Sequence, residues 1–315
     1  MIFSIVIPTF NRPHILTNTL DCLEKQEASF PYEVIVVDDS STIPLPDLGF
    51  GKGKRSNWKL LRNETNLGRA ATRNRGIRES RGEYILMIDD DIWASPSLLQ
   101  VHYQTQKRIG GGAVIGAVPP AREIDDIVWN RYIKRRFERI HFRLQDLHLD
   151  YGLFLTGNAS IPAGLIKDLT GFDERFKDYS FEDTDMGYRL HKAGVRFLHV
   201  PEAVGYHMFS EDLESLCQKA YQMGRSSYIF VNMHPNESHA IQYHSIAIGP
   251  WNGKGALKNV LKIIIFSGPV KAILKHITFA AAFLKFETLV FAFMPWLELQ
   301  HMAQGANDQR SSHRS

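Results

Sequence analysis

The chain has little cysteine, little excess charge and no long apolar run. Its two cysteines, Cys22 and Cys217, cannot form a disulfide framework and form no Cys-X-X-Cys pair, which agrees with a reducing compartment. A net charge of +3 gives no argument for nucleic acid as a partner. No run of about eighteen uncharged apolar residues is present, and the opening MIFSIVIPTF lacks the basic segment of a signal peptide. We therefore expect neither a clear spanning helix nor a leader.

What is present is an ordinary globular composition, 44% hydrophobic and 23% charged, in which short β-branched runs alternate with helical periodicity. This alternation predicts right-handed βαβ units, hence an α/β fold with a mostly parallel, Rossmann-type sheet flanked by helices. We expect strands at 3–7, 34–37, 59–61, 84–88, 113–118, 153–156 and 195–198. We expect helices at 13–26, 68–79, 126–145, 181–192 and 213–231.

Polar clusters follow three of the expected strands, at Thr9–Asn11, Asp38–Ser41 and Asp89–Asp91. Ligands of open α/β sheets bind beyond the carboxyl ends of the strands, so these clusters predict one shared site. The three successive carboxylates of Asp89–Asp91 repel one another unless a cation neutralises them, and oxygen ligands of this kind suit Mg²⁺ or Mn²⁺. A solvated acidic turn is the alternative.

Two further segments have both a chemical and a structural interpretation. FEDTDMGYR places Glu182, Asp183 and Asp185 at a helix start, where an acid could act as general base or simply complement the helix dipole. Asp185 could also pair with Arg189 four residues on. NLGRAATRNRG opens a helix whose amides and arginines could receive a diphosphate or lie exposed.

These segments together resemble the family 2 glycosyltransferases. The matching stretches, over about residues 2–208, are SIVIPTFNR, VIVVDDSS, NLGRAATRNRG, GEYILMIDDD, GNASIPAGLIKDLTGFDERF and FEDTDMGYRLHKAG. The resemblance implies a GT-A fold, a nucleoside-diphosphate sugar donor, Mn²⁺ or Mg²⁺ as cofactor, and inversion at the anomeric carbon. It also implies a nucleotide-sugar site formed by Pro8, Thr9, Asp38, Asp39, Arg73, Asp89 and Asp90.

Within that site the resemblance places Thr9 and Asp39 at the base, Arg73 at the base or diphosphate, and Asp89 near the ribose. It makes Asp91 the metal ligand of the DxD motif, Asp183 the catalytic base, and His207 a further metal ligand. A histidine alone is more often structural. The QxxRW motif of some processive members is absent, which favours transfer of a single sugar.

The composition changes near residue 250, so we expect a catalytic domain over residues 1–250 and a basic amphipathic helical extension with a polar tail over 251–315. Residues 254–285 hold six lysines and no acid, and Pro269 separates two expected helical segments, the second reaching Trp296. Such helices are typical of membrane surfaces and favour contact through residues 254–296. Helices packed on the catalytic domain, or a span over 273–296, are the alternatives.

The sequence therefore predicts an inverting, metal-dependent glycosyltransferase acting on a glycan or lipid-linked acceptor in surface glycan or glycolipid synthesis. We expect it in the cytoplasm, peripheral at the inner face of the membrane. One alternative is a nucleotidyltransferase on a related sheet, although PTFNRP lacks the glycine-rich basic loop usual there. The other is an inactive nucleotide-sugar-binding protein.

Overall fold

The computed structural model describes residues 1–144, 151–237 and 266–313, which fall into two compact units. The first unit comprises Met1–Ile124, Lys134–Lys177 and Glu182–Phe209. The second comprises Asp125–Ile133, Asp178–Phe181 and Ser210–Ser315. The domain boundary expected near residue 250 lies outside the described residues.

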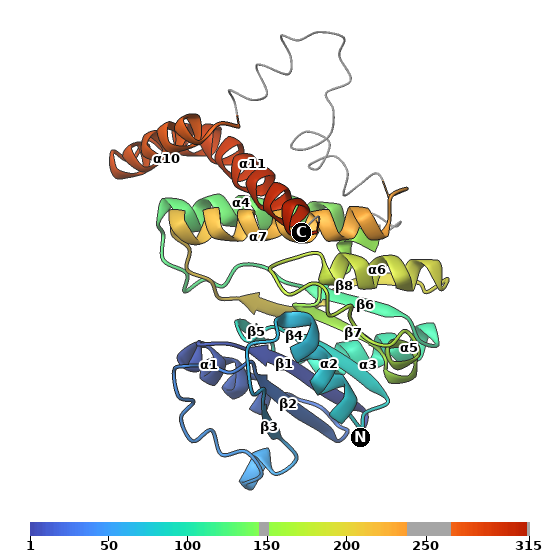
Figure 1. Ribbon diagram of the computed structural model, residues 1–315. Coiled ribbons are helices and arrows are strands. Elements are labelled where there is room, and N and C mark those ends of the chain that lie inside the picture. Colours follow the sequence, from blue (N-terminus) through green and yellow to red (C-terminus); the bar gives the residue numbers. More distant parts are fainter. Residues whose placement is uncertain (145–150, 238–265, 314–315) are drawn as a thin grey trace. The chain divides into compact units, whose positions relative to one another are not determined.

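The first unit is built on an eight-stranded sheet with the order β3-β2-β1-β4-β7-β6-β8-β5 (Figure 1). Strands β1 to β4 pair in parallel, as do β6 and β8, whereas β7 runs antiparallel between β4 and β6, and β5 runs antiparallel to β8. The strands are β1 (Phe3–Thr9), β2 (Tyr32–Asp38), β3 (Lys59–Arg62), β4 (Tyr84–Ile88), β5 (Ile92–Ala94), β6 (Ala113–Ala117), β7 (Asn158–Pro162) and β8 (Phe197–His207). The predicted α/β fold with a mostly parallel sheet is thus confirmed.

Helices cover both faces of this sheet because successive residues of a strand point to opposite sides. In β1, Ile5 and Ile7 pack in one buried cluster with Leu20 of α1, whereas Val6 packs in the other with Ile77 of α2. The helices of this unit are α1 (Pro13–Glu24), α2 (Arg69–Glu79), α3 (Leu98–Ile109), α5 (Ala163–Asp168) and α6 (Glu182–Lys192), with 3₁₀ turns at Gly53–Arg55 and Tyr151–Leu153. Helix α4 (Val128–Leu144) begins within the second unit's residues.

The strand expected at 153–156 is wrong. The chain forms a 3₁₀ turn at Tyr151–Leu153, residues 154–157 are in no strand, and β7 begins only at Asn158. Phe154 is fully buried against α6, where a Cβ added at Gly187 would lie 2.9 Å from the Phe154 Cβ and 2.3 Å from the Tyr151 oxygen. The apolar run therefore reflects packing against a helix and not pairing in the sheet.

The second unit contains helices α7 (Leu213–Met233), α10 (Gly268–Phe283) and α11 (Glu287–Ser312). Helices α7 and α11 cross (Figure 1), and each has a glycine where the other helix comes closest. A Cβ added at Gly224 would lie 1.9 Å from the Met302 oxygen, and one added at Gly305 would lie 1.9 Å from the Tyr221 oxygen. Each helix thus needs a residue without a side chain at the crossing, because the facing backbone fills that space.

The C-terminal helices differ from the expectation in where they end. The helix after Pro269 stops at Phe283, Lys285 adopts a positive φ of 60°, and α11 then runs through Pro295 to Ser312. The stretch expected to be a polar tail is therefore largely helical. Lys258 and Lys262 lie outside the described residues. None of the helices in the described ranges combines the length and the hydropathy needed to cross a bilayer.

Candidate active site

The polar clusters predicted from the sequence meet at one edge of the sheet. In the parallel register of β1 and β2, Pro8 lies opposite Val37 and Thr9 opposite Asp38. The Thr9 hydroxyl donates a 2.7 Å hydrogen bond to Asp90 Oδ2, which joins the end of β1 to the acidic run after β4. The shared edge expected from βαβ topology is confirmed.

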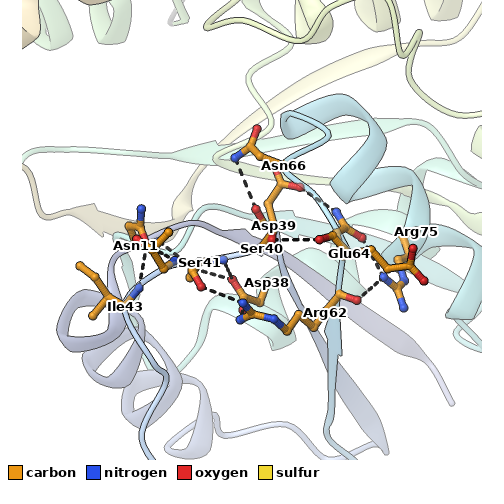
Figure 2. Close-up of polar contacts among 12 residues, drawn as sticks. Asn11, Asp38, Asp39, Ser40, Ser41, Ile43, Arg62, Glu64, Asn66 and Arg75 are labelled. Atoms are coloured by element: carbon orange, nitrogen blue, oxygen red, sulfur yellow. Dashed lines mark hydrogen bonds and ion pairs between the residues drawn. The ribbon is translucent and has the colours of Figure 1, made fainter.

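The loop after β2 is fixed by a set of polar contacts centred on Asn11 and Asp38 (Figure 2). Asn11 adopts a positive φ of 56°, and its side-chain oxygen accepts from the amide of Ile43 at 3.1 Å. The backbone amide of Asn11 donates to the Ser41 hydroxyl at 2.8 Å, and the backbone amide of Ser41 donates to Asp38 Oδ1 at 2.9 Å. Arg62, at the end of β3, pairs with the other Asp38 oxygen. Asp38 therefore holds the loop in place.

Asp39 follows β2 in the chain, and its carboxylate contacts the residues just before helix α2. Its carboxylate accepts from the amides of Leu67 and Gly68, each at 2.9 Å, and from the Asn63 side chain at 2.8 Å. An anion is favoured at a helix N-terminus. The helix start expected to receive a diphosphate thus binds the chain's own carboxylate through these two amides, and the base-binding role of Asp39 stays a prediction.

Arg73 is buried and bridges two carboxylates from distant parts of the chain. Its guanidinium donates to Asp89 Oδ1 and to Glu182 Oε1, each at 2.8 Å. Burial alone would lower the pKa of Arg73, but the charges of Asp89 and Glu182 raise it above its ordinary value. In this structure Arg73 connects the end of β4 to the start of α6, and its role at the base or diphosphate stays a prediction.

Asp183, the predicted base, lies in the first turn of α6 and is partly exposed. Burial of its carboxylate, followed by the charge of the adjacent Glu182, raises the pKa of Asp183 to about 7, while Arg73 opposes the shift. A carboxyl group with a pKa near the working pH is well suited to accept a proton. The neighbouring Asp185 pairs with Arg189 at 2.8 Å, which confirms the structural interpretation of that residue.

Asp90 and Asp91 share one positively charged side chain, Arg12, which the sequence analysis did not include in the site. Arg12 Nη1 lies 2.7 Å from Asp90 Oδ1 and 2.9 Å from Asp91 Oδ2. Burial raises the pKa of Asp90 to about 6 despite the charge of Arg12. Burial would also raise the pKa of Asp91, but the charges of His207 and Arg12 hold it well below its usual range.

His207, at the end of β8, reaches the Asp91 carboxylate through the pairing of β8 with β5. The antiparallel pairing of β5 with β8 places Ile92 opposite His207, directly after Asp91. His207 Nε2 lies 3.4 Å from Asp91 Oδ2, and the imidazole packs edge-on against Phe137 and Phe209. The two predicted metal ligands therefore lie together.

Two models of known protein families match this chain. The family model "Glycosyl transferase family 2" matches residues 4–161, and a second model, "Glycosyl transferase family group 2", matches residues 84–297. The first match covers half of the chain. The chain belongs to the family 2 glycosyltransferases. The enzyme class expected from the resemblance is thus confirmed at the level of the family.

Curated relatives of this glycosyltransferase are similar over part of their length. Chondroitin synthase of Escherichia coli is 29% identical over 65% of this chain and 34% of its own length. Validoxylamine A glucosyltransferase of Streptomyces hygroscopicus subsp. jinggangensis is 28% identical over 75% of this chain and 61% of its own length. The chain thus spans between about a third and three fifths of these two proteins.

Solved structures share the fold of this glycosyltransferase. The mannosyltransferase PcManGT from Pyrobaculum calidifontis, solved with GDP-Man and Mn²⁺, aligns with a TM-score of 0.64 at 18% identity over 99% of this chain and 88% of its own. TarS 1–349 of S. aureus, solved with UDP-GlcNAc, aligns with a TM-score of 0.54 at 18% identity over 99% of this chain and 92% of its own. These similarities confirm the GT-A-like fold.

Two polar atoms at this site have unused capacity for a ligand. Asp91 Oδ1 and His207 Nδ1 are buried and find no hydrogen-bond partner among the described residues. Across residues 1–144, 151–237 and 266–313, no group of three or more His, Cys, Asp or Glu side chains forms a metal site by itself. A carboxylate and an imidazole that leave further positions to diphosphate oxygens suit Mn²⁺ or Mg²⁺.

Sequence reasoning also missed the part played by Glu182, which appeared only as one acid in a helix start. The sequence contains only weak signals for Arg12 and Glu182. Arg12 directly follows a strand-end cluster, so it had to lie near the acidic run at the same sheet edge. Glu182 precedes the predicted base and is an acid at a buried position of α6, which calls for a cationic partner.

Proposed function

We propose that this glycosyltransferase moves a sugar from a nucleoside-diphosphate sugar to a hydroxyl acceptor, with inversion and with a divalent cation, in the synthesis of a surface glycan or glycolipid. The observation that carries the proposal is the convergence of two carboxylate systems in one unit. Asp91 lies with His207, and Glu182, which directly precedes Asp183, is joined to the same edge of the sheet through Arg73 and Asp89.

Each system has its own chemical task. Asp91 and His207 would hold the cation, and the cation would neutralise charge on the departing nucleoside diphosphate. Asp183 accepts the proton of the acceptor hydroxyl as the hydroxyl attacks the opposite face of the sugar, and a positioned base of this kind contributes about 10²–10⁴ in rate. Glu182 and Arg73 set the charge around Asp183, and Asp38 and Asp39 fix the two segments beside the expected base pocket.

The donor and the acceptor follow from chemistry shared with the relatives. Structural neighbours were solved with UDP, UDP-GlcNAc or GDP-Man, and curated relatives include synthases of polysaccharides. We therefore expect a uridine or guanosine diphosphate sugar as donor and a glycan or lipid-linked hydroxyl as acceptor. Sugar and acceptor pockets come from variable loops, so the family alone does not choose among these donors.

A screen of nucleotide sugars by thermal shift, with Mn²⁺ or Mg²⁺, tests the proposal. A bound donor raises the melting temperature with its occupancy, and the stabilising donor is then incubated with hydroxyl acceptors. Release of a nucleoside diphosphate with glycoside formation supports the proposal. Release of pyrophosphate from a nucleoside triphosphate would instead identify a nucleotidyltransferase. Donor binding without transfer or hydrolysis would identify an inactive binding protein.

A membrane surface is the partner we propose for the C-terminal unit, which agrees with a lipid-linked acceptor and a peripheral location at the inner face of the membrane. Lys271 pairs with Gln304 and Lys275 with Glu214, so both lysines face neighbouring helices. The outer face of α10 is apolar instead, and Phe279 and Phe283 are 61% and 79% exposed. An apolar helix face near lysines is typical of helices that lie in the headgroup region of a bilayer.

A further inference from the structure

Arg12 occupies a position whose local structure does not require an arginine. It precedes α1, where its carbonyl accepts from the amide of Leu16 at 3.0 Å and its side chain makes no capping hydrogen bond. Serine, threonine, asparagine or aspartate would stabilise a helix start better. The side chain of Arg12 is instead directed to two carboxylates that follow β4.

The same Arg12 nitrogen contacts Asp90 Oδ1 at 2.7 Å and Asp91 Oδ2 at 2.9 Å. Asp90 is itself fixed by the Thr9 hydroxyl and is buried, so it forms a stable anchor for the guanidinium. Asp91 differs, because its other oxygen is buried without a partner among the described residues. Arg12 thus neutralises a carboxylate that has unused capacity for a cation.

A divalent cation on Asp91 would repel the guanidinium of Arg12 from its present position. Three positive charges would then share one buried carboxylate, and like charges at this range repel strongly where water is scarce. The side chain of Arg12 is 35% exposed, so the guanidinium can move without unpacking the core. A guanidinium that keeps one contact to Asp90 still has free N–H groups in the fork geometry that matches phosphate oxygens.

We propose that Arg12 is an internal counter-ion of Asp91 that gives way to the divalent cation and then, still anchored on Asp90, binds the diphosphate of the donor. This inference rests on the proposed function. It assigns Arg12 opposite effects on two ligands: it opposes binding of the cation alone and favours binding of the nucleotide once the cation is present. Damage to the fold would weaken both.

Calorimetry on the full chain tests these opposite effects with Mn²⁺ alone, and then with UDP and GDP at saturating Mn²⁺. Without nucleotide, we expect Arg12→Met to bind Mn²⁺ about tenfold more tightly than the parent. The change removes a positive charge that opposes the cation, and a neighbouring charge of this kind typically shifts an equilibrium by about one pKa unit, or tenfold. We expect its affinity for the better nucleotide to fall by about tenfold, as for loss of a charge-assisted contact. Arg12→Lys should lie between Arg12→Met and the parent for both ligands.

The matched control is Arg81→Met, which removes another arginine from a buried carboxylate, Glu33, elsewhere in the same unit. It should lower the melting temperature and leave Mn²⁺ affinity unchanged. Equal or weaker Mn²⁺ binding by Arg12→Met would overturn the counter-ion role, and unchanged nucleotide affinity would overturn the diphosphate contact. If the parent bound neither nucleotide while Arg12→Met bound Mn²⁺ more tightly, the proposed function would fail and the counter-ion role would stand.

Discussion

Arg73 and Glu182 form a buried ion pair across 109 positions of the sequence, with Arg73 Nη1 2.8 Å from Glu182 Oε1. The other arm of the same guanidinium contacts Asp89 at 2.8 Å. One side chain of α2 thus connects the acidic run after β4 with the helix that carries Asp183. The charge of this bridge acts on Asp183, because Glu182 raises its pKa and Arg73 lowers it.

Glu182→Gln should therefore change both stability and the pH profile. Removing one partner of a buried pair costs about 3–5 kcal/mol, so the melting temperature should fall. Loss of the Glu182 charge lowers the pKa of Asp183, so the acidic limb of the rate profile should move to lower pH. Arg73→Met should move that limb to higher pH. Transfer rates measured across pH check both shifts, and identical limbs in the two variants would contradict the coupling.

Asp183→Asn should nearly abolish transfer and at the same time stabilise the protein at alkaline pH. The pKa of about 7 in the folded protein exceeds that of the unfolded chain, so the folded state binds the proton more tightly. The stability contributed by this group is complete below about pH 4 and is lost as the pH rises through about 7. The variant avoids this loss, which amounts to at most about 4 kcal/mol because the partly exposed carboxylate is screened by water.

Denaturant unfolding at pH 5 and pH 8 measures this gain. Asp183→Asn should gain more stability over the parent at pH 8 than at pH 5, and its affinity for nucleotide should stay near that of the parent. Asp168→Asn, a change of an exposed aspartate on α5, serves as the control and should show no such difference. Transfer at the parental rate would refute Asp183 as the base.

Local sequence patterns were sufficient for the part of the fold that holds β1, β2 and β4. Each of these strands is a short buried run, and the handedness of βαβ units places their carboxyl ends side by side. The convergence of Thr9, Asp38 and Asp90 followed from that rule. Asp39 was placed correctly at this edge, but no local pattern showed that it binds the amides at the start of α2.

The remaining features depend on contacts between distant segments, which a single sequence does not reveal. The insertion of β7 between β4 and β6 and the pairing of β5 with β8 are antiparallel and lie outside the βαβ rule. His207 meets Asp91 only through that last pairing, so the family resemblance alone indicated it. Arg12 and Glu182 were missed for the same reason, because their partners are far along the chain.

Removal of the divalent cation should abolish transfer, and His207→Ala should weaken Mn²⁺ binding. We propose His207 and Asp91 as the two protein ligands of the cation, so loss of the imidazole should lower the affinity for Mn²⁺ by at least about tenfold. Calorimetry with Mn²⁺ in the presence of UDP or GDP measures this change. Phe209→Leu, which changes the ring packing against His207 and Phe137 but keeps the imidazole, should have a smaller effect. Equal losses in the two variants would mean that His207 has a packing role only.

The last prediction is that the exposed face of α10 binds membranes. Phe283→Asp and Phe279→Asp should each reduce flotation with anionic vesicles, because burying a phenylalanine side chain contributes about 1.5–3 kcal/mol. Leu60→Asp, which places the same charge at a residue of β3 that is 41% exposed, is the matched control and should leave binding unchanged. Vesicles of neutral lipid should bind the parent less well, because the exposed Lys285 just after the end of α10 is attracted to anionic headgroups. If both phenylalanine variants float like the parent, α10 does not contact the bilayer. The proposal of a lipid-linked acceptor then loses its structural support, and the transfer chemistry proposed for the first unit is unaffected.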